Sequence, residues 1–135
     1  QTPDWSLTED PNLVPESAYG GKSEGGSQLR RRLQDLMWQK AGIIRSGEQL
    51  RSALEELEVI RSQIRHDTSE AAGGPGALEL SNMHLVAETI IRAALAREES
   101  RGSHYRSDYP RTEDALAGHI VLRKQENGIR LSWEN

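Results

Sequence analysis

The chain has 135 residues, enough for about one domain with a single hydrophobic core. Hydrophobic residues make up 35% of it and aromatic residues 4%, with no Phe. A core built from Leu, Ile, Val, Ala and Met is typical of helical proteins. The acidic side chains of residues 1–27 account for the whole net charge of −4. The balanced remainder excludes a general nucleic-acid surface, because phosphate binding needs a clustered basic excess.

The chain contains no cysteine, which excludes disulfides, thiol catalysis and cysteine metal sites and fits a reducing compartment. No apolar run approaches the roughly 20 residues that a membrane-spanning helix needs, and no export signal is visible. We therefore expect a cytoplasmic location. Because the sequence starts at Gln1 with an acidic segment containing Pro and Gly, we also expect a piece of a longer polypeptide.

Residues 1–27 contain three prolines and the run GGKSEGG. They predict a linker or irregular arm with too little apolar surface to order itself, although Trp5 and Tyr19 are candidates for docking on a neighbour. The triplet Gly21-Lys22-Ser23 is reminiscent of a nucleotide-binding loop. That loop needs a glycine where this chain has Glu16, and a preceding strand, so the linker interpretation is favoured.

Apolar residues at three- and four-residue spacing predict three helices. The first starts at Gln28. The second runs from Gly47 to about Arg65, preceded by a capping box formed by Ser46 and Gln49. The third, rich in small residues, runs from about Ala77 to Glu99, and Gly102 is well placed to end it. The predicted buried faces are Leu29, Leu33, Leu36 and Met37; Leu50, Ala53, Leu54, Leu57, Ile60 and Ile64; and Leu80, Met83, Ala87, Ile90, Ile91, Ala94 and Leu95.

The remaining segments predict a loop and a hairpin. Glycines and a proline in DTSEAAGGPG at 67–76 mark the loop, and Asn127-Gly128 between two alternating segments marks a β-hairpin. The predicted fold is mainly α: an antiparallel three-helix bundle, spectrin-repeat-like, with an irregular N-terminal arm and a C-terminal β-hairpin. The predicted parts are the arm at 1–27, the bundle with its terminal loop at 28–110, and the tail at 111–135.

A dense polar cluster begins in the last turn of the third predicted helix and continues beyond it: Arg97, Arg101, His104, Arg106 and Asp108. Arginine forks bind carboxylates and phosphates, and histidine can titrate near neutral pH, so the cluster is a candidate anion or domain-docking site. The alternative is a loop pinned by its own ion pairs, with Glu98, Glu99 and Asp108 as partners. Spacing alone favours neither, although the neighbouring Tyr105 and Tyr109 favour docking.

No residue is predicted to be catalytic, to bind a cofactor or to hold a metal. His84 and Glu88 lie one helical turn apart, but a metal site needs three or four ligands, so a hydrogen bond along the helix face is the favoured interpretation. The serines lie in cap and loop contexts, without a strand-turn-helix elbow for a nucleophile.

Three segments carry a resemblance to a known family: LMWQKAGIIRS at 36–46, LELSNMHLVAETIIRAALARE at 78–98 and ESRGSHYRSDYP at 99–110. They resemble the end of the flavoproteins that include L-aspartate oxidase and the succinate dehydrogenase and fumarate reductase flavoprotein subunits. Met37-Trp38 and the following Gly42 to Arg45, with the short tail after Pro110, look more like the L-aspartate oxidase branch.

The resemblance implies a C-terminal helical domain that packs on the flavin-binding and capping domains of the same polypeptide. It implies a parent enzyme that uses FAD to oxidise L-aspartate to iminoaspartate, with dioxygen or fumarate as acceptor, on the way to quinolinate and NAD. This segment has no G-x-G-x-x-G sequence for the FAD pyrophosphate, so we expect it to bind no FAD and to be inactive alone. The alternatives are the corresponding domain of a succinate or fumarate flavoprotein, or a stand-alone helical module whose cationic loop binds an acidic protein or RNA.

Overall fold

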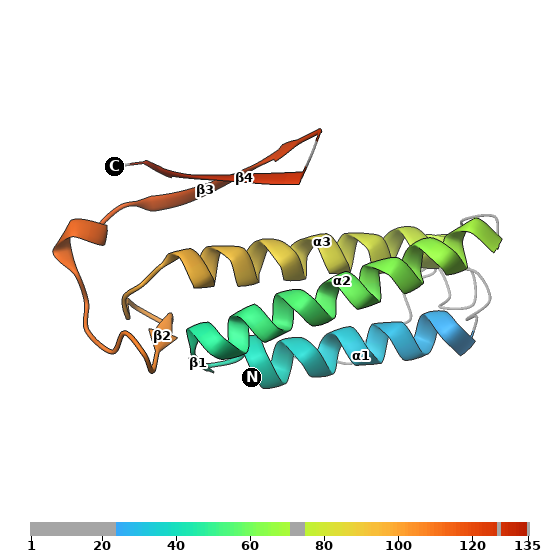
Figure 1. Cartoon of the computed structure of the whole chain (residues 1–135), viewed down its shortest axis with the longest axis horizontal. Helices are drawn as coiled ribbons and strands as arrows, with labels where there is room; N and C mark the ends of the chain where they lie inside the picture. Colours follow the sequence, from blue (N-terminus) through green and yellow to red (C-terminus); the bar gives the residue numbers. More distant parts are fainter. Residues whose placement is uncertain (1–23, 71–74, 127, 135) are drawn as a thin grey trace, which may run out of the picture.

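The computed structural model describes residues 24–70, 75–126 and 128–134. Three helices lie side by side, with α2 antiparallel to α1 and α3, and a two-stranded hairpin follows them (Figure 1). The elements in chain order are α1 (Glu24–Ala41), β1 (Ile44–Arg45), α2 (Gly47–Glu70), α3 (Pro75–Ala96), β2 (Tyr105–Arg106), a 3-10 turn (Asp114–Leu116), β3 (His119–Gln125) and β4 (Gly128–Glu134). The predicted mainly α fold with a terminal hairpin is confirmed.

The predicted apolar faces form one core between the helices. Each fully buried Leu or Ile contributes about 1.5–3 kcal/mol relative to exposure. Met37, Leu54, Met83 and Leu95 pack at the edge of this core. Ile90 is the exception, since its spacing predicts burial and it is 42% exposed. The buried apolar residues are Leu29, Leu33, Leu36, Ala41, Leu50, Ala53, Leu57, Ile60, Ile64, Leu80, Ala87, Ile91 and Ala94.

The observed first and last residues of the helices differ from several of the predicted boundaries. Helix α1 begins at Glu24 rather than Gln28, so the end of GGKSEGG is helical and not linker. The first turn of a helix needs no buried face, and apolar periodicity therefore does not mark its start. Helix α2 begins at Gly47 as predicted but continues to Glu70. The predicted 67–76 loop is helical at 67–70 and 75–76, while its residues 71–74, like Trp5 and Tyr19, lie outside the described part.

Helix α3 ends at Ala96, before both Glu99 and Gly102. Gly102 does not cap it; with φ of +60° it serves the tight turn that joins Arg101 to His104. The Arg106 side chain caps this helix end instead, because its Nη1 donates to the carbonyls of Ala94 and Leu95 at 2.9 and 3.2 Å. These terminal carbonyls are thus satisfied by a residue that follows the helix by ten positions.

The cap of α2 and the hairpin follow the sequence signals. The Gln49 amide donates to Ser46 Oγ at 3.2 Å, and the Ser46 hydroxyl donates in turn to Gln49 Oε1. Strands β3 and β4 pair antiparallel from His119 opposite Glu134 to Gln125 opposite Gly128. Gly128 has a φ of +129°, which an L side chain rarely adopts. Within the described ranges, no helix is both long and apolar enough to cross a bilayer.

Candidate functional site

Two segments that lie far apart in the sequence meet at one end of the bundle. Strands β1 and β2 pair in parallel, with Ile44 opposite Tyr105 and Arg45 opposite Arg106. The Ser107 amide extends the pairing by donating to the Arg45 carbonyl at 2.8 Å. The motif at 36–46 is thereby joined to the motif at 99–110, which the sequence did not predict because two-residue strands have no recognisable period.

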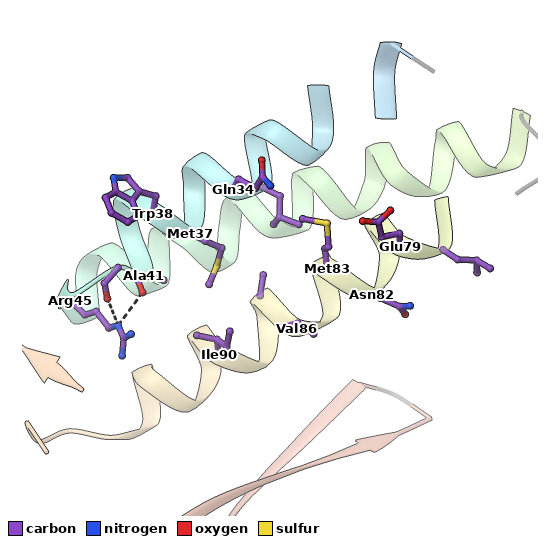
Figure 2. Close-up of a pocket in the computed structure, with 14 residues that line it drawn as sticks. Gln34, Met37, Trp38, Ala41, Arg45, Glu79, Asn82, Met83, Val86 and Ile90 are labelled. Carbon is purple, nitrogen blue, oxygen red and sulfur yellow. Dashed lines mark hydrogen bonds between the residues drawn. The ribbon is translucent and has the colours of Figure 1, made fainter. Parts of the chain in front are cut away.

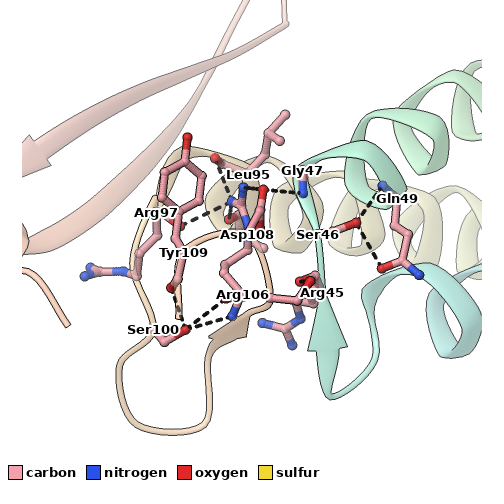
Figure 3. A network of polar contacts seen from close by, with 12 residues as sticks. Arg45, Ser46, Gly47, Gln49, Leu95, Arg97, Ser100, Arg106, Asp108 and Tyr109 are labelled. Atoms are coloured by element: carbon pink, nitrogen blue, oxygen red, sulfur yellow. Dashed lines mark hydrogen bonds and ion pairs between the residues drawn. The ribbon is translucent and has the colours of Figure 1, made fainter. Parts of the chain in front are cut away.

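Arg106 is the centre of this junction and is only 1% exposed. Its Nε and Nη2 donate to the two Asp108 carboxylate oxygens at 2.8 and 2.7 Å, a bidentate pair (Figure 3). Asp108 Oδ2 also accepts the Gly47 amide at 2.9 Å. The Arg106 guanidinium and the Gly47 amide together hold the pKa of Asp108 well below its usual range. One ion pair therefore ties the end of α3 to the start of α2.

Glu99 anchors a second ion-pair group and is 0% exposed. Its Oε1 accepts from Arg101 Nε at 2.9 Å and from Arg97 Nη1, and its Oε2 accepts the Glu113 amide at 2.9 Å. The hydrogen bond from Arg101, followed by those from the Glu113 amide and Arg97, lowers the pKa of Glu99 to about 2. This buried carboxylate is therefore fully charged near neutral pH.

Arg97 links this group to the hairpin. Its guanidinium donates to the carbonyls of Leu116 and Gly118 at 3.0 and 2.7 Å, just before β3 begins. The same group lies over the Trp133 ring of β4, 4.8 Å from the ring centroid. Because an isolated two-stranded hairpin is marginal in water, these contacts help to hold β3 and β4 in place.

His104 lies between one basic side chain and a backbone carbonyl. Arg45 Nη1 lies 2.9 Å from His104 Nδ1, and the Arg97 carbonyl lies 3.2 Å from Nε2. Since a guanidinium only donates and a carbonyl only accepts, the ring must be neutral with its proton on Nε2. Burial lowers the pKa of His104, and the nearby cations Arg45, Arg106 and Arg97 lower it further.

The structure thus brings all five predicted site residues into one cluster. The arginine forks of Arg97 and Arg106 are directed at carboxylates and carbonyls of this chain, as the self-pinned alternative expected, with Glu99 and Asp108 as the partners. The polar cluster shapes the loop, and large apolar and aromatic side chains are exposed beside it, with Ile44 65% exposed and Tyr105 42% exposed.

His84 and Glu88 do not bond to one another, which corrects the predicted hydrogen bond along the helix face. His84 Nε2 lies 2.8 Å from the Leu57 carbonyl of α2, and Glu88 accepts from Arg92 at 2.8 Å. The imidazole therefore crosses the helix interface rather than following its own helix. Among the residues described, no group of three or more His, Asp or Glu is arranged to hold a metal ion.

An open apolar groove runs between α1 and α3, with a volume of about 1010 Å³. Met37 and Met83 point into the space between the two helices (Figure 2). The sequence did not predict this groove directly. The spacing of Ile90 predicts burial in the core, whereas the structure places this residue in the groove lining. The lining residues are Leu33, Gln34, Met37, Trp38, Ala41, Gly42, Arg45, Leu78, Glu79, Asn82, Met83, Val86, Ala87 and Ile90.

Residues 30–135 match the family described as fumarate reductase flavoprotein C-term. The chain belongs to this family. It is 36% identical to one subunit of the fumarate reductase (CoM/CoB) of Methanothermobacter marburgensis, covering 73% of this chain and 19% of that protein. It is 38% identical to the L-aspartate oxidase of Acinetobacter baylyi, covering 66% and 16%. The chain spans about a fifth of the length of such curated relatives.

Solved structures share the fold of this family member. The quinol fumarate reductase FrdA of E. coli superposes with a TM-score of 0.72 at 22% identity, covering 86% of this chain and 21% of that one. The Mycobacterium smegmatis Sdh1 complex in its apo form gives a TM-score of 0.64 at 26% identity, covering 90% and 21%. The helical bundle and its hairpin are therefore an arrangement found in flavoprotein subunits.

Proposed function

We propose that this chain is the C-terminal domain of an FAD-dependent L-aspartate oxidase and is catalytically inert by itself. The parent would oxidise L-aspartate to iminoaspartate, a step toward quinolinate and NAD. The family match over residues 30–135 carries the proposal, and L-aspartate oxidases of Acinetobacter baylyi and Pyrococcus furiosus, at 38% and 36% identity, support the branch.

FAD would be bound by the rest of the parent. The chain has no G-x-G-x-x-G sequence that could approach a pyrophosphate. The cluster around Arg106 also offers no free anion site, since its guanidinium is already shared between Asp108 and backbone carbonyls. These residues do not fit a flavin phosphate, and we assign no redox step to them.

The role proposed for Arg97, Arg101, His104, Arg106 and Asp108 is to pin the loop that faces the flavin-binding and capping domains. A loop held by buried ion pairs presents Tyr105 and Tyr109 in one orientation, and preorganised aromatic side chains are effective contact groups. Arg101 is more exposed than Arg97 and Arg106, with 38% of its side chain accessible. Its replacement in the full-length enzyme, Arg101→Ala, should lower flavin retention without unfolding the bundle; unchanged FAD content and turnover would remove this role.

A succinate dehydrogenase or fumarate reductase flavoprotein is the second candidate parent. The family description itself names fumarate reductase. The Mycobacterium tuberculosis fumarate reductase flavoprotein subunit is 33% identical over 87% of this chain, a longer match than that of the Acinetobacter baylyi oxidase. This candidate predicts a parent that works with further subunits.

The deciding experiment is anaerobic reduction of the flavin in the full-length protein. L-aspartate should bleach the flavin absorbance, and succinate should leave it unchanged if the parent is an L-aspartate oxidase. Bleaching by succinate, or reoxidation by fumarate without any response to L-aspartate, would replace the oxidase with the second candidate. A purified full-length protein without FAD would exclude both.

A further inference from the structure

We infer that the α1/α3 groove is the binding site for an apolar helix from the preceding part of the same polypeptide. That part is called the flavoprotein body below. The inference rests on the proposed function only in requiring a flavoprotein parent, of either candidate class. It assigns a specific surface to domain docking, separate from the polar cluster around Arg106.

The groove is where exposed apolar side chains gather. Trp38 is 79% exposed, Leu78 66% and Val86 56%, and all three line the groove. On the outer face of α2, by contrast, Val59 is the one large apolar side chain exposed within the described residues. A contiguous apolar patch of this kind marks a binding surface, whereas a single exposed Val needs no explanation.

The shape of the groove favours a helix as its occupant. Helices α1 and α3 run in the same direction, and the α3 lining extends from Leu78 to Ile90, about 18 Å at the helical rise per residue. An added helix would complete a four-helix arrangement. A helix satisfies its own backbone, whereas an extended segment in so apolar a groove would leave amides and carbonyls unpaired.

The charged side chains at the two ends of the groove form hydrogen bonds within the chain. At one end, Arg30 and Glu79 neutralise each other across α1 and α3 through two hydrogen bonds of 2.6 and 2.7 Å. At the other, Arg45 Nε donates to the Ala41 and Gly42 carbonyls. The flexible thioethers of Met37 and Met83 adapt to the shape of an apolar partner. The chemistry therefore suits an apolar helix face and not a charged ligand.

Two observations point to the same polypeptide as the source of this helix. The match is to a C-terminal region, and the relatives are about four times as long as this chain, so a flavoprotein parent has a large body on the N-terminal side. That body would be connected through α1, which itself forms one wall of the groove. Tethering raises the effective concentration of a helix in that body to about the millimolar range, which favours it over a separate chain.

The groove also continues into the end of the bundle that carries the family motifs. Trp38, Ala41, Gly42 and Arg45 line it at the end of α1. The next exposed residues are Ile43 and Ile44, and Ile44 pairs with Tyr105 of the pinned loop. Exposed apolar residues therefore lie both along the groove and beside the pinned loop, so a body that contacts the loop would be adjacent to the groove.

The test is cysteine labelling of the full-length, FAD-loaded flavoprotein, because this domain has no cysteine of its own. Val86→Cys and Leu78→Cys report on the groove, and Val59→Cys is the matched control on α2. Each variant is treated with a maleimide in its native state and in urea, and the peptide that carries the substitution is quantified by mass spectrometry. Flavin absorbance confirms that each variant is folded.

We expect native labelling of both groove variants to be at least about tenfold slower than that of the Val59→Cys control, after each is normalised to its rate in urea. Equal rates in the FAD-loaded protein would overturn the groove inference and leave the proposed function intact. Protection that appears only with a second subunit, or that is lost on dilution, would assign the groove to another chain and also overturn it. A protein without FAD would instead overturn the proposed function.

Discussion

Replacing Arg106 by Ala should be the most damaging single substitution in the terminal loop. Its Nη1 donates to three carbonyls, of Ala94, Leu95 and Arg97, at 2.9, 3.2 and 3.3 Å. With two protons on that nitrogen, about two full hydrogen bonds are lost, each worth about 1.5 kcal/mol at the low end for a charged donor. The pair with Asp108 adds about 0–1 kcal/mol, since the Asp108 side chain is 37% exposed and re-solvates.

The sum of these contributions is about 3–4 kcal/mol, a large part of the roughly 5–15 kcal/mol that stabilises a domain. Urea unfolding of the 135-residue chain, followed by circular dichroism, measures it. Arg106→Lys keeps the charge but cannot bind both the carboxylate fork and the carbonyls, so it should lose about half as much. Arg61→Ala is the control, because Arg61 is an exposed partner of Glu58 and should cost under about 0.5 kcal/mol. A loss below about 1 kcal/mol for Arg106→Ala would refute this account of the cluster.

Three other substitutions test neighbouring contacts. Because the pKa of His104 is lowered in the folded chain, the unfolded chain takes up a proton first as the pH drops below about 6.5, and stability should fall there. This pH dependence should be weaker in His104→Gln, as measured by urea midpoints at pH 7.5 and 5.5. Because the pKa of Glu99 is about 2, its contribution is present above about pH 4.5 and is lost as the pH falls toward 2; Glu99→Gln should be less stable at pH 7 and show a shallower acid transition by circular dichroism. Gly47→Ala should lose about 1 kcal/mol in thermal unfolding despite the better helix propensity of Ala, because its Cβ would lie 2.9 Å from Asp108 Oδ2 and 3.0 Å from Arg106 Nη2; an unchanged or higher melting temperature would show that the pair moves aside freely.

Sequence periodicity predicted the parts of the fold that are governed by repeated burial. The Leu and Ile stripes of α1 and α2 are buried as expected, because a three- to four-residue spacing leaves a helix one apolar face to cover. The hairpin could also be predicted from the sequence, since the alternation of apolar and polar residues and the Asn127-Gly128 pair are local signals. Where the end of an element depends on a distant residue, as with Arg106 at the end of α3, local pattern could not predict it.

Only some of the residues that form the candidate site could be predicted from the sequence. The five polar site residues were found by their density, and Glu99 and Asp108 were named among their partners. The contributions of Arg45 and the Gly47 amide were missed, because they come from a segment some sixty positions earlier. The one available signal was that both segments carry the family resemblance. The groove was missed for a related reason: periodicity treats Ile90 as core and cannot show that its neighbours leave it uncovered.

The polar cluster and the apolar surface have different roles in docking. Glu99 and Arg106 are charged, buried and already paired within the chain, so a docking partner gains little Coulomb energy from them and would lose more by disturbing them. The free energy of docking must then come mainly from apolar surface such as Trp38 and Val86, while the ion pairs fix the shape of the loop beside it. It follows that a groove substitution such as Val86→Glu should weaken docking without changing the domain's own stability, whereas Arg106→Ala should lower both.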